Sequence, residues 1–388
     1  MKLITLTKEE FQCYSETVPS YSFMQSVQMG DLLEKRGARV VYLSLKQEGE
    51  IQVAALVYSL PMLGGLHMEL NSGPIYTQKD VLPVFYEGLK EYAKQNGVLE
   101  LLVKPYETYQ TFDSDGKPID EEEKSIIQDL CNLGYQFDGL PTGYPNGDIF
   151  WHFIKDLKGY DEKSLLKSFN KNSIRNIQSA YDFNLIVRNV ERDEISKFKQ
   201  IIEETGKRQG FKDKDLDYYY KLYDTFENKA AFLIAEVNPK KSIEALDVKQ
   251  AGLDEKSKQF QQQYQALQKK KDLLRNLDSE SDNIALACAL IIYTNTEATY
   301  LFGGSFTEYQ KLSAPFLLQY HAMKQALERK IDKYNFLGIQ GIFDGSDGVL
   351  RFKQNFNGYI VRKAGIFRYY PNPIKFKYLQ FLKKIIGR

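Results

Sequence analysis

The chain has 388 residues, of which 43% are hydrophobic and 27% are charged, and its net charge is +1. This length predicts two or three domains, and this composition excludes a largely disordered protein. The longest uncharged apolar run, residues 284–293, is too short for a membrane-spanning helix, which needs about 20 residues. Because residues 1–10 also lack the apolar stretch of a signal peptide, the sequence predicts a cytoplasmic protein.

The first half of the chain predicts a mixed set of helices and strands. A polar turn at residues 47–50 separates two strands, and the pair Asn96-Gly97 is a typical helix stop. The expected elements in chain order are helices at 8–14 and 27–36, strands at 40–46 and 51–60, a helix at 81–95, a strand at 98–103 and a helix at 124–133.

The second half repeats this order. We expect strands at 232–237 and 284–293, a glycine-rich turn at 299–305, a helix at 314–330 and a strand at 335–339. Such a repeat predicts an α/β (α+β) fold of two tandem domains packed side by side. The first would span 1–150 and the second would be formed by 151–238 and 283–388. A ligand cleft between or along such domains is a usual arrangement.

A polar segment, residues 239–282, interrupts the second domain. Its apolar residues repeat every seven positions at Leu253, Phe260, Leu267 and Leu274, which is a short coiled-coil pattern. We expect a helical hairpin that projects from the domain as a docking surface or clamp. The alternative is a helix that packs on its own domain.

Two basic features stand out. Residues 348–388 contain ten basic residues, nine aromatic residues and no acidic residue, so the rest of the chain has an acidic excess. Lys163, Lys167, Lys171 and Arg175 recur every four residues and would form one stripe on a single helix. Both features suit a polyanion such as RNA, a diphosphate or anionic lipid head groups. Solvated positive faces are the alternative for both.

Several common chemistries have no motif in this sequence. No GxxxxGK[ST], GxGxxG or GxSxG motif occurs, and the pyrophosphate loop of coenzyme-A-dependent acetyltransferases is not found. No CxxC or HExxH spacing occurs either, so we expect neither a metal site nor a disulfide framework. The dispersed residues Cys13, Cys131, Cys288, His67, His152 and His321 are expected to be ordinary core or surface residues.

Five further segments stand out as possible signatures: Phe23-Met24-Gln25-Ser26, Ser72-Gly73-Pro74, Tyr300-Leu301-Phe302-Gly303-Gly304-Ser305, Pro315-Phe316-Leu317-Leu318-Gln319 and Phe352-Lys353-Gln354-Asn355-Phe356. Together they resemble the signatures of the Fem family of peptidoglycan bridge-forming aminoacyltransferases. The resemblance covers nearly the whole chain and is greatest to streptococcal members. It implies two acetyltransferase-like (GNAT-type) domains with a coiled-coil arm, although the arm here is shorter than is usual in the family.

The resemblance also implies an activity. Family members transfer an amino acid from aminoacyl-tRNA to an amine on the membrane-bound precursor lipid II, and they need neither a metal nor coenzyme A. The expected amino acid is alanine, added as the second bridge residue at the inner face of the cell membrane. An acyl-CoA-dependent N-acyltransferase, or a non-catalytic protein that binds RNA or a membrane, are the alternatives.

Site residues follow from the resemblance position by position. Phe352-Lys353 matches the family's catalytic lysine, whose ammonium would stabilise the oxyanion of the tetrahedral intermediate and keep the attacking amine neutral. The precursor's phosphates would be bound by Lys35 or Arg36 and by Lys214 with Tyr218. A lysine at 214 replaces the family's arginine, which keeps the charge but not the bidentate geometry. Further expected cleft residues are Tyr106, Tyr300, Gly303 and Gly304, and the basic stripe would contact tRNA.

Overall fold

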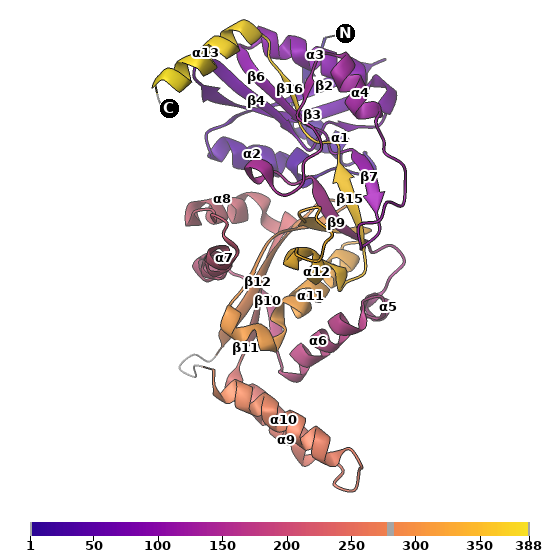
Figure 1. Ribbon diagram of the computed structural model, residues 1–388, viewed down its shortest axis with the longest axis vertical. Coiled ribbons are helices and arrows are strands. Elements are labelled where there is room, and N and C mark those ends of the chain that lie inside the picture. The colour runs from indigo at the N-terminus through magenta and orange to yellow at the C-terminus, as the bar shows by residue number, and fades with distance from the viewer. Residues whose placement is uncertain (1, 278–282, 387–388) are drawn as a thin grey trace.

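The computed structural model describes residues 2–277 and 283–386, which form two lobes and a projecting arm (Figure 1). Each lobe is built on one eight-stranded sheet. The first lobe lies at one end of the long axis, and the arm extends beyond the second lobe at the other end (Figure 1). No helix in this described part of the chain is long and apolar enough to cross a membrane.

The first sheet has the order β1-β2-β3-β4-β6-β16-β8, with β5 paired to β3. One of its faces packs against α1 and α2, and the other packs against α3 and α4. The strands are β1 (Ile4–Thr5), β2 (Arg39–Gln47), β3 (Glu50–Met62), β4 (Gly65–Asn71), β5 (Ile75–Tyr76), β6 (Val98–Lys104), β8 (Gln136–Phe137) and β16 (Phe367–Tyr369). The helices are α1 (Lys8–Ser15), α2 (Val27–Lys35), α3 (Leu82–Gln95), α4 (Ser125–Asn132) and α13 (Pro373–Ile386).

The second sheet has the order β10-β11-β12-β13-β14-β9-β15-β7. Its central strand β12 is the apolar run expected from the sequence, and it is buried along nearly all its length because helices cover both faces. The strands are β7 (Thr108–Phe112), β9 (Trp151–Asp156), β10 (Ile186–Asn189), β11 (Ala230–Val237), β12 (Ile284–Tyr293), β13 (Ala298–Ser305), β14 (Lys333–Gly338) and β15 (Tyr359–Lys363). The helices are α5 (Glu162–Lys167), α6 (Lys171–Asp182), α7 (Ile195–Gln209), α8 (Leu216–Phe226), α11 (Ala314–Glu328) and α12 (Gly348–Gln354).

The two lobes are interlocked. Strand β7 leaves the first lobe to pair with β15 in the second sheet, and β16 returns to the first sheet to pair with β6 and β8. One hydrophobic core also runs across the boundary, from α1, α2 and β3 to α7, α8 and β11. The predicted domain bounds, 1–150 for the first domain and 151–238 with 283–388 for the second, did not include this exchange of strands.

The arm is the expected helical hairpin, formed by α9 (Pro239–Ala251) and α10 (Phe260–Arg275). Leu246, Leu267 and Leu274 are buried between its helices and the second lobe. Asp182, the last residue of α6, accepts ion pairs from Lys249 at 2.8 Å and Lys270 at 2.6 Å, so both arm helices are tied to the lobe. Residues 278–282 of the predicted segment lie outside the described residues.

Two local predictions were wrong. The segment around 299–305 is not a glycine-rich turn but strand β13, which pairs with β12 up to Ser305. The basic stripe does not lie on one helix, because α5 ends at Lys167 and α6 starts at Lys171. Asn170 caps the second helix by accepting a hydrogen bond from Ser173 N, which is a typical helix start.

Candidate active site

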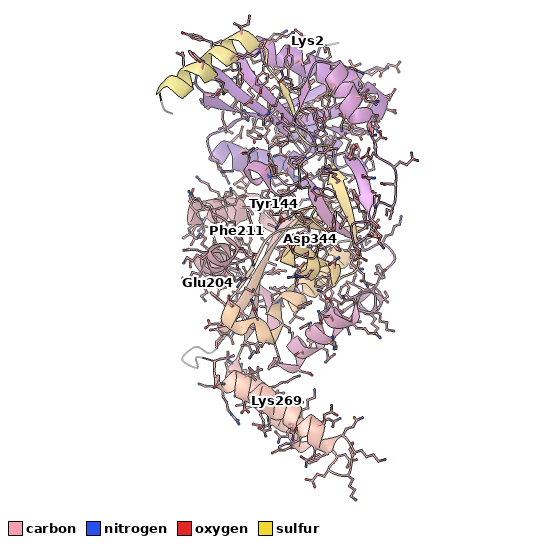
Figure 2. All side chains as sticks on the ribbon, viewed as in Figure 1. Lys2, Tyr144, Glu204, Phe211, Lys269 and Asp344 are labelled. Carbon is pink, nitrogen blue, oxygen red and sulfur yellow. The ribbon has the colours of Figure 1, made fainter. Side chains whose placement is uncertain are left out.

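A cavity of about 210 Å³ lies where the two sheets meet. Both lobes contribute to the lining of this cavity, as do residues 147–150 of the connection between β8 and β9. Tyr144 of the same connection lies between the lobes in Figure 2. The polar residues of the cavity lining include Asn71, Ser72, Lys104, Tyr106, Asp148, His152, Glu297, Thr299, Asn335 and Lys363. Such a cavity at a domain boundary is the usual position of a ligand site.

The second sheet opens beside this cavity. In the first sheet the parallel strands β4 and β6 pair from Leu66–Val98 to Asn71–Lys104. The corresponding strands β13 and β14 pair only at Ala298–Tyr334 and Thr299–Asn335. After Thr299 and Asn335 the two strands no longer pair with each other. The second lobe, unlike the first, can therefore admit a ligand between these strands.

A buried carboxylate, that of Glu297, organises the cavity. The Tyr106 hydroxyl donates to Glu297 Oε1 at 2.9 Å, Thr299 Oγ1 donates to the same oxygen at 3.0 Å, and Asn335 Nδ2 does so at 3.2 Å. Glu297 is 3% exposed, so these donors replace the water that a carboxylate would otherwise require. Burial, and then the charge of Glu297, hold the pKa of Tyr106 well above its ordinary value, so this hydroxyl remains a donor.

Two basic side chains, Lys363 and His152, lie beside this network. Lys363 Nζ donates to the backbone oxygen of Tyr106 at 2.8 Å and lies 3.7 Å from the centre of the Tyr106 ring. Burial lowers the pKa of Lys363 to about 8. Burial, and then the charge of Lys363, hold the pKa of His152 well below its ordinary value, so its imidazole is neutral at pH 7. Besides the ion pair of Lys104 with Asp148, the cavity therefore contains the Glu297 carboxylate, a neutral imidazole and a weakened ammonium.

Lys353 lies in the interior next to this cavity. It is 4% exposed, and its Nζ donates to the backbone oxygen of Gly338 at 2.5 Å. Gly338 follows Leu337, which lines the cavity, and is paired with His152 in the sheet. Burial lowers the pKa of Lys353 to about 7, and the charge of Asp347 opposes that shift. The side chain is thus a buried, weakened ammonium with N–H groups to spare.

The backbone next to Gly338, which Lys353 contacts, has an unusual conformation. Leu337 has a φ of +60°, a left-handed conformation that a bulky residue rarely adopts. Asn335 Oδ1 accepts a hydrogen bond from Leu337 N at 2.8 Å, which holds that conformation. Asp347 accepts from Val349 N and Leu350 N and so starts α12, which carries Lys353. Strain of this kind concentrates at functional sites.

The remaining predicted residues lie outside the cavity lining. Phe352 packs against the rings of Phe316 and Phe356, at 5.1 and 5.5 Å between centres, and does not line the cavity. The Tyr300 hydroxyl fills the space beside Gly303, while Gly304 lies against the backbone of α7. The space at both glycines is therefore taken by protein atoms, whereas Thr299 and Leu301 are the β13 residues in the cavity lining.

Lys35, Arg36 and Tyr218 meet at the seam between α2 and α8. Lys35 Nζ donates to Thr225 Oγ1 at 2.7 Å, and the Arg36 guanidinium lies 5.2 Å from the centre of the Tyr218 ring. Lys214 is exposed in the loop before α8. These side chains come from both lobes but lie outside the cavity lining.

The four cations of the basic stripe are all exposed. Within the described residues, none of Lys163, Lys167, Lys171 and Arg175 forms an ion pair. They remain free to meet an anion, although they are divided between α5 and α6.

Sequence reasoning missed most of the cavity's polar core. Glu297, Asn335 and Lys363 were not predicted, and His152 was expected to be an ordinary core or surface residue. The one available signal was the polar stretch Thr294-Asn295-Thr296-Glu297 between two apolar strands. A charged residue at the start of a buried strand is unusual unless it has partners.

Comparisons with known proteins agree with this arrangement. The model of the FemAB family matches residues 6–384. Aminoacyltransferase FemB of Staphylococcus epidermidis is 27% identical over 418 residues, which cover 99% of each chain. Aminoacyltransferase FemA of Staphylococcus aureus is 25% identical over 397 residues, covering 95% of this chain and 94% of that one.

Solved structures show the same fold. The crystal structure of FemX superposes with a TM-score of 0.77 at 22% identity and covers all of both chains. A tandem GNAT protein from the clavulanic acid biosynthesis pathway superposes with a TM-score of 0.51 at 8% identity, covering 96% of this chain and 99% of that one. The tandem acetyltransferase-like fold predicted from the sequence is thereby confirmed. The chain belongs to the FemAB family, and its curated relatives are aminoacyltransferases.

Proposed function

We propose that this chain transfers an amino acid, alanine, from aminoacyl-tRNA to an amine of the interpeptide bridge of lipid II. Its membership of the FemAB family supports aminoacyl transfer to a peptidoglycan precursor. The observation that carries the finer proposal is the buried Lys353 ammonium beside a cavity that both lobes line. The ester of aminoacyl-tRNA is already activated, so the enzyme's main task is to stabilise negative charge on the carbonyl oxygen.

The reaction balances without a further reactant. The acceptor amine attacks the ester carbonyl carbon, and the new C–N bond gives a tetrahedral intermediate with a negative oxygen. The bond from that carbon to the ribose oxygen of tRNA then breaks, and the proton lost by the amine ends on the ribose oxygen. The products are an amide and a free tRNA.

Lys353 suits the intermediate better than the substrate. With a pKa of about 7 its side chain is divided between ammonium and amine at neutral pH. A negative oxygen nearby raises that pKa and favours the ammonium, so the interaction is strongest when the intermediate forms. Gly338 uses one of the three ammonium N–H groups, and the others are available to the oxyanion.

The cavity suits the acceptor amine. Glu297 provides a buried carboxylate that can bind an ammonium or receive its proton, and the neutral His152 and the weakened ammonium of Lys363 line the same cavity. An ammonium must lose a proton before it attacks, and a base within one cavity can take it. We assign the exposed cations Lys163, Lys167, Lys171 and Arg175 to tRNA, and Lys35, Arg36, Lys214 and Tyr218 to the precursor's phosphates.

The test supplies radiolabelled alanyl-tRNA or seryl-tRNA together with lipid II or with lipid II that already carries one bridge residue. We expect label from alanyl-tRNA in the extended form of the second acceptor. Label in neither lipid product, with tight coenzyme A binding by calorimetry, would instead favour an acyl-CoA-dependent enzyme. Label in neither product without such binding would favour a non-catalytic protein.

A further inference from the structure

Helix α13 presents an apolar face to solvent. Ile374 is 82% exposed, Tyr378 is 62% exposed and Phe381 is 61% exposed. Their spacing of four and three residues places them on one side of the helix. A row of large apolar side chains with such high exposure is unusual on the surface of soluble proteins and typically marks an interaction site.

The opposite face of α13 is fixed to the first lobe. Leu379 packs against Gly64 at the tip of the β3–β4 hairpin, where any larger residue would collide with it. The ring of Phe376 lies 4.2 Å from that of Tyr370. Asn372 accepts a hydrogen bond from Lys375 N at 2.9 Å and so starts the helix. The exposed row is therefore held in place by a docked helix.

The same hairpin tip extends the apolar surface. Leu63, next to Gly64, is 52% exposed, and Leu60 is 39% exposed. The contact of Gly64 with Leu379 places the hairpin tip, with its exposed Leu63, next to α13, although the two segments are about 300 residues apart in the sequence. We call Leu63, Ile374, Tyr378 and Phe381 the apical patch, because α13 lies on the first lobe, at the far end from the arm (Figure 1).

The charge next to the apical patch has one sign. Lys375 and Lys377 are exposed, and among residues 2–277 and 283–386 they form no ion pair. The chain has no acidic residue from position 348 to its end. An apolar face with lysines beside it is the composition of helices that lie in an anionic membrane interface. A second copy fits less well, because the lysines of two copies would meet.

We propose that the apical patch docks this chain on an anionic membrane surface, with Ile374, Tyr378, Phe381 and Leu63 inserted among the lipids and Lys375 and Lys377 against their head groups. The arm then points away from the membrane, because α9 and α10 lie at the opposite end of the molecule (Figure 1). The proposal does not require the chemistry of the cavity, and its test needs no acyl donor.

The test is co-sedimentation of the full chain with vesicles of phosphatidylglycerol or of phosphatidylcholine. We expect binding to the anionic vesicles that weakens with salt, and little binding to the neutral ones. The triple variant I374S/Y378S/F381S and the double variant K375E/K377E should each bind about tenfold more weakly or worse. Variants V248S and K240E/K241E change an equally exposed apolar residue and an equal pair of exposed lysines on α9, and they should bind like the wild type.

Three results would overturn the proposal. The triple variant could bind anionic vesicles as the wild type does, with its circular dichroism unchanged. The wild type could bind both kinds of vesicle equally. Light scattering could show a wild-type dimer that the triple variant converts to a monomer, which would identify a second copy as the occupant.

A comparison of acceptors separates this proposal from the proposed function. The triple variant should lose turnover of lipid II in vesicles but keep turnover of a soluble precursor that lacks the lipid tail. Lys353→Met should lose both. If wild-type protein binds the vesicles but turns over neither acceptor, the proposed function fails and the membrane docking stands.

Discussion

The Tyr106 hydroxyl donates a hydrogen bond to Glu297 Oε1 at 2.9 Å, and this contact joins the end of β6 in the first sheet to the start of β13 in the second. The strand after Tyr106, β7, already belongs to the second sheet. Tyr106 is thus at the crossing between the lobes and in the wall of the cavity, so its hydrogen bond both fixes the lobes and orients a carboxylate.

Replacing Tyr106 by phenylalanine should therefore cost stability as well as activity. The change removes a buried hydrogen bond to a carboxylate, and we expect a loss of about 1.5–3 kcal/mol in the free energy of unfolding. Tyr135→Phe is the matched control, because its hydroxyl donates to the neutral Tyr86 backbone oxygen at 2.9 Å. That variant should lose about 1 kcal/mol. Equal losses in urea denaturation would contradict a charged Glu297.

The basic stripe makes a prediction about salt. If Lys163, Lys167, Lys171 and Arg175 contact tRNA phosphates, replacing all four with glutamine should weaken tRNA binding. It should also reduce the slope of log affinity against log salt by about 3, since each contact contributes roughly 0.7–0.9. Folding should not change, because all four side chains are exposed. A slope equal to that of the wild type in a filter-binding titration would remove the stripe from the tRNA site.

His67 should make the first lobe sensitive to pH. Its hydrogen bonds to Glu100 and Glu69 raise the pKa of His67 to about 9. The folded protein therefore holds a proton that the unfolded chain releases near 6.5, so this stabilisation is complete below pH 6.5 and is lost as the pH rises through 9. We expect His67→Gln to cost roughly 2 kcal/mol at pH 6 and little at pH 9.5.

His321 supplies the control for that experiment. Burial lowers the pKa of His321, so its contribution changes only below pH 6.5. His321→Gln should show no pH dependence between 7 and 9.5. Glu100 also forms an ion pair with Arg368 of β16 at 2.7 Å. The protection factors of the β16 amides against hydrogen exchange should therefore fall at high pH together with the loss of stability.

Lys353 should produce a pH dependence of the opposite kind. The unfolded lysine keeps its proton up to about 10.5, whereas burial lowers the pKa in the folded protein to about 7. The folded state is therefore penalised most below pH 7, and the penalty disappears as the pH rises toward 10.5. Wild type should gain roughly 3 kcal/mol relative to Lys353→Met between pH 7 and pH 10 in denaturant titrations. A constant difference would mean that Lys353 is not desolvated.

The sequence predicted those parts of the fold that have a strong local pattern. The run that forms β12 is apolar throughout, and Leu267 and Leu274 mark the arm by their seven-residue spacing. The exchanged strands β7 and β16 have five and three residues, and their partners lie far away in the chain. No local pattern can choose such partners, because only long-range pairing decides which sheet they join.

Two of the residues expected at the site lie at the cavity, although their roles remain predictions: Tyr106 lines it and Lys353 lies beside it. Lys353 follows a phenylalanine in a matching motif, and the structure places it in the interior beside the cavity. The network of Glu297, Asn335 and His152 is assembled from three separate strands or strand ends, so no spacing in the sequence reveals it. The basic stripe was wrongly predicted to lie on one helix, because its four-residue spacing continues across Asn170, where a second helix begins.

The most direct test of the central claim measures single-turnover rates of amide formation for wild type, Lys353→Met and Lys155→Met. Lys155 is a matched control, since it is also buried, donates to a backbone oxygen at 3.0 Å and has a pKa lowered to about 8. Neither lysine is in the cavity lining, but the acceptor of Lys353, Gly338, follows Leu337 of the lining, whereas the acceptor of Lys155, Asn357, is next to no lining residue. We predict that Lys353→Met loses at least about a hundredfold in rate with its fold intact, while Lys155→Met stays within a few fold of the wild type. Equal rates for the two variants would contradict a role for Lys353 in stabilising the oxyanion.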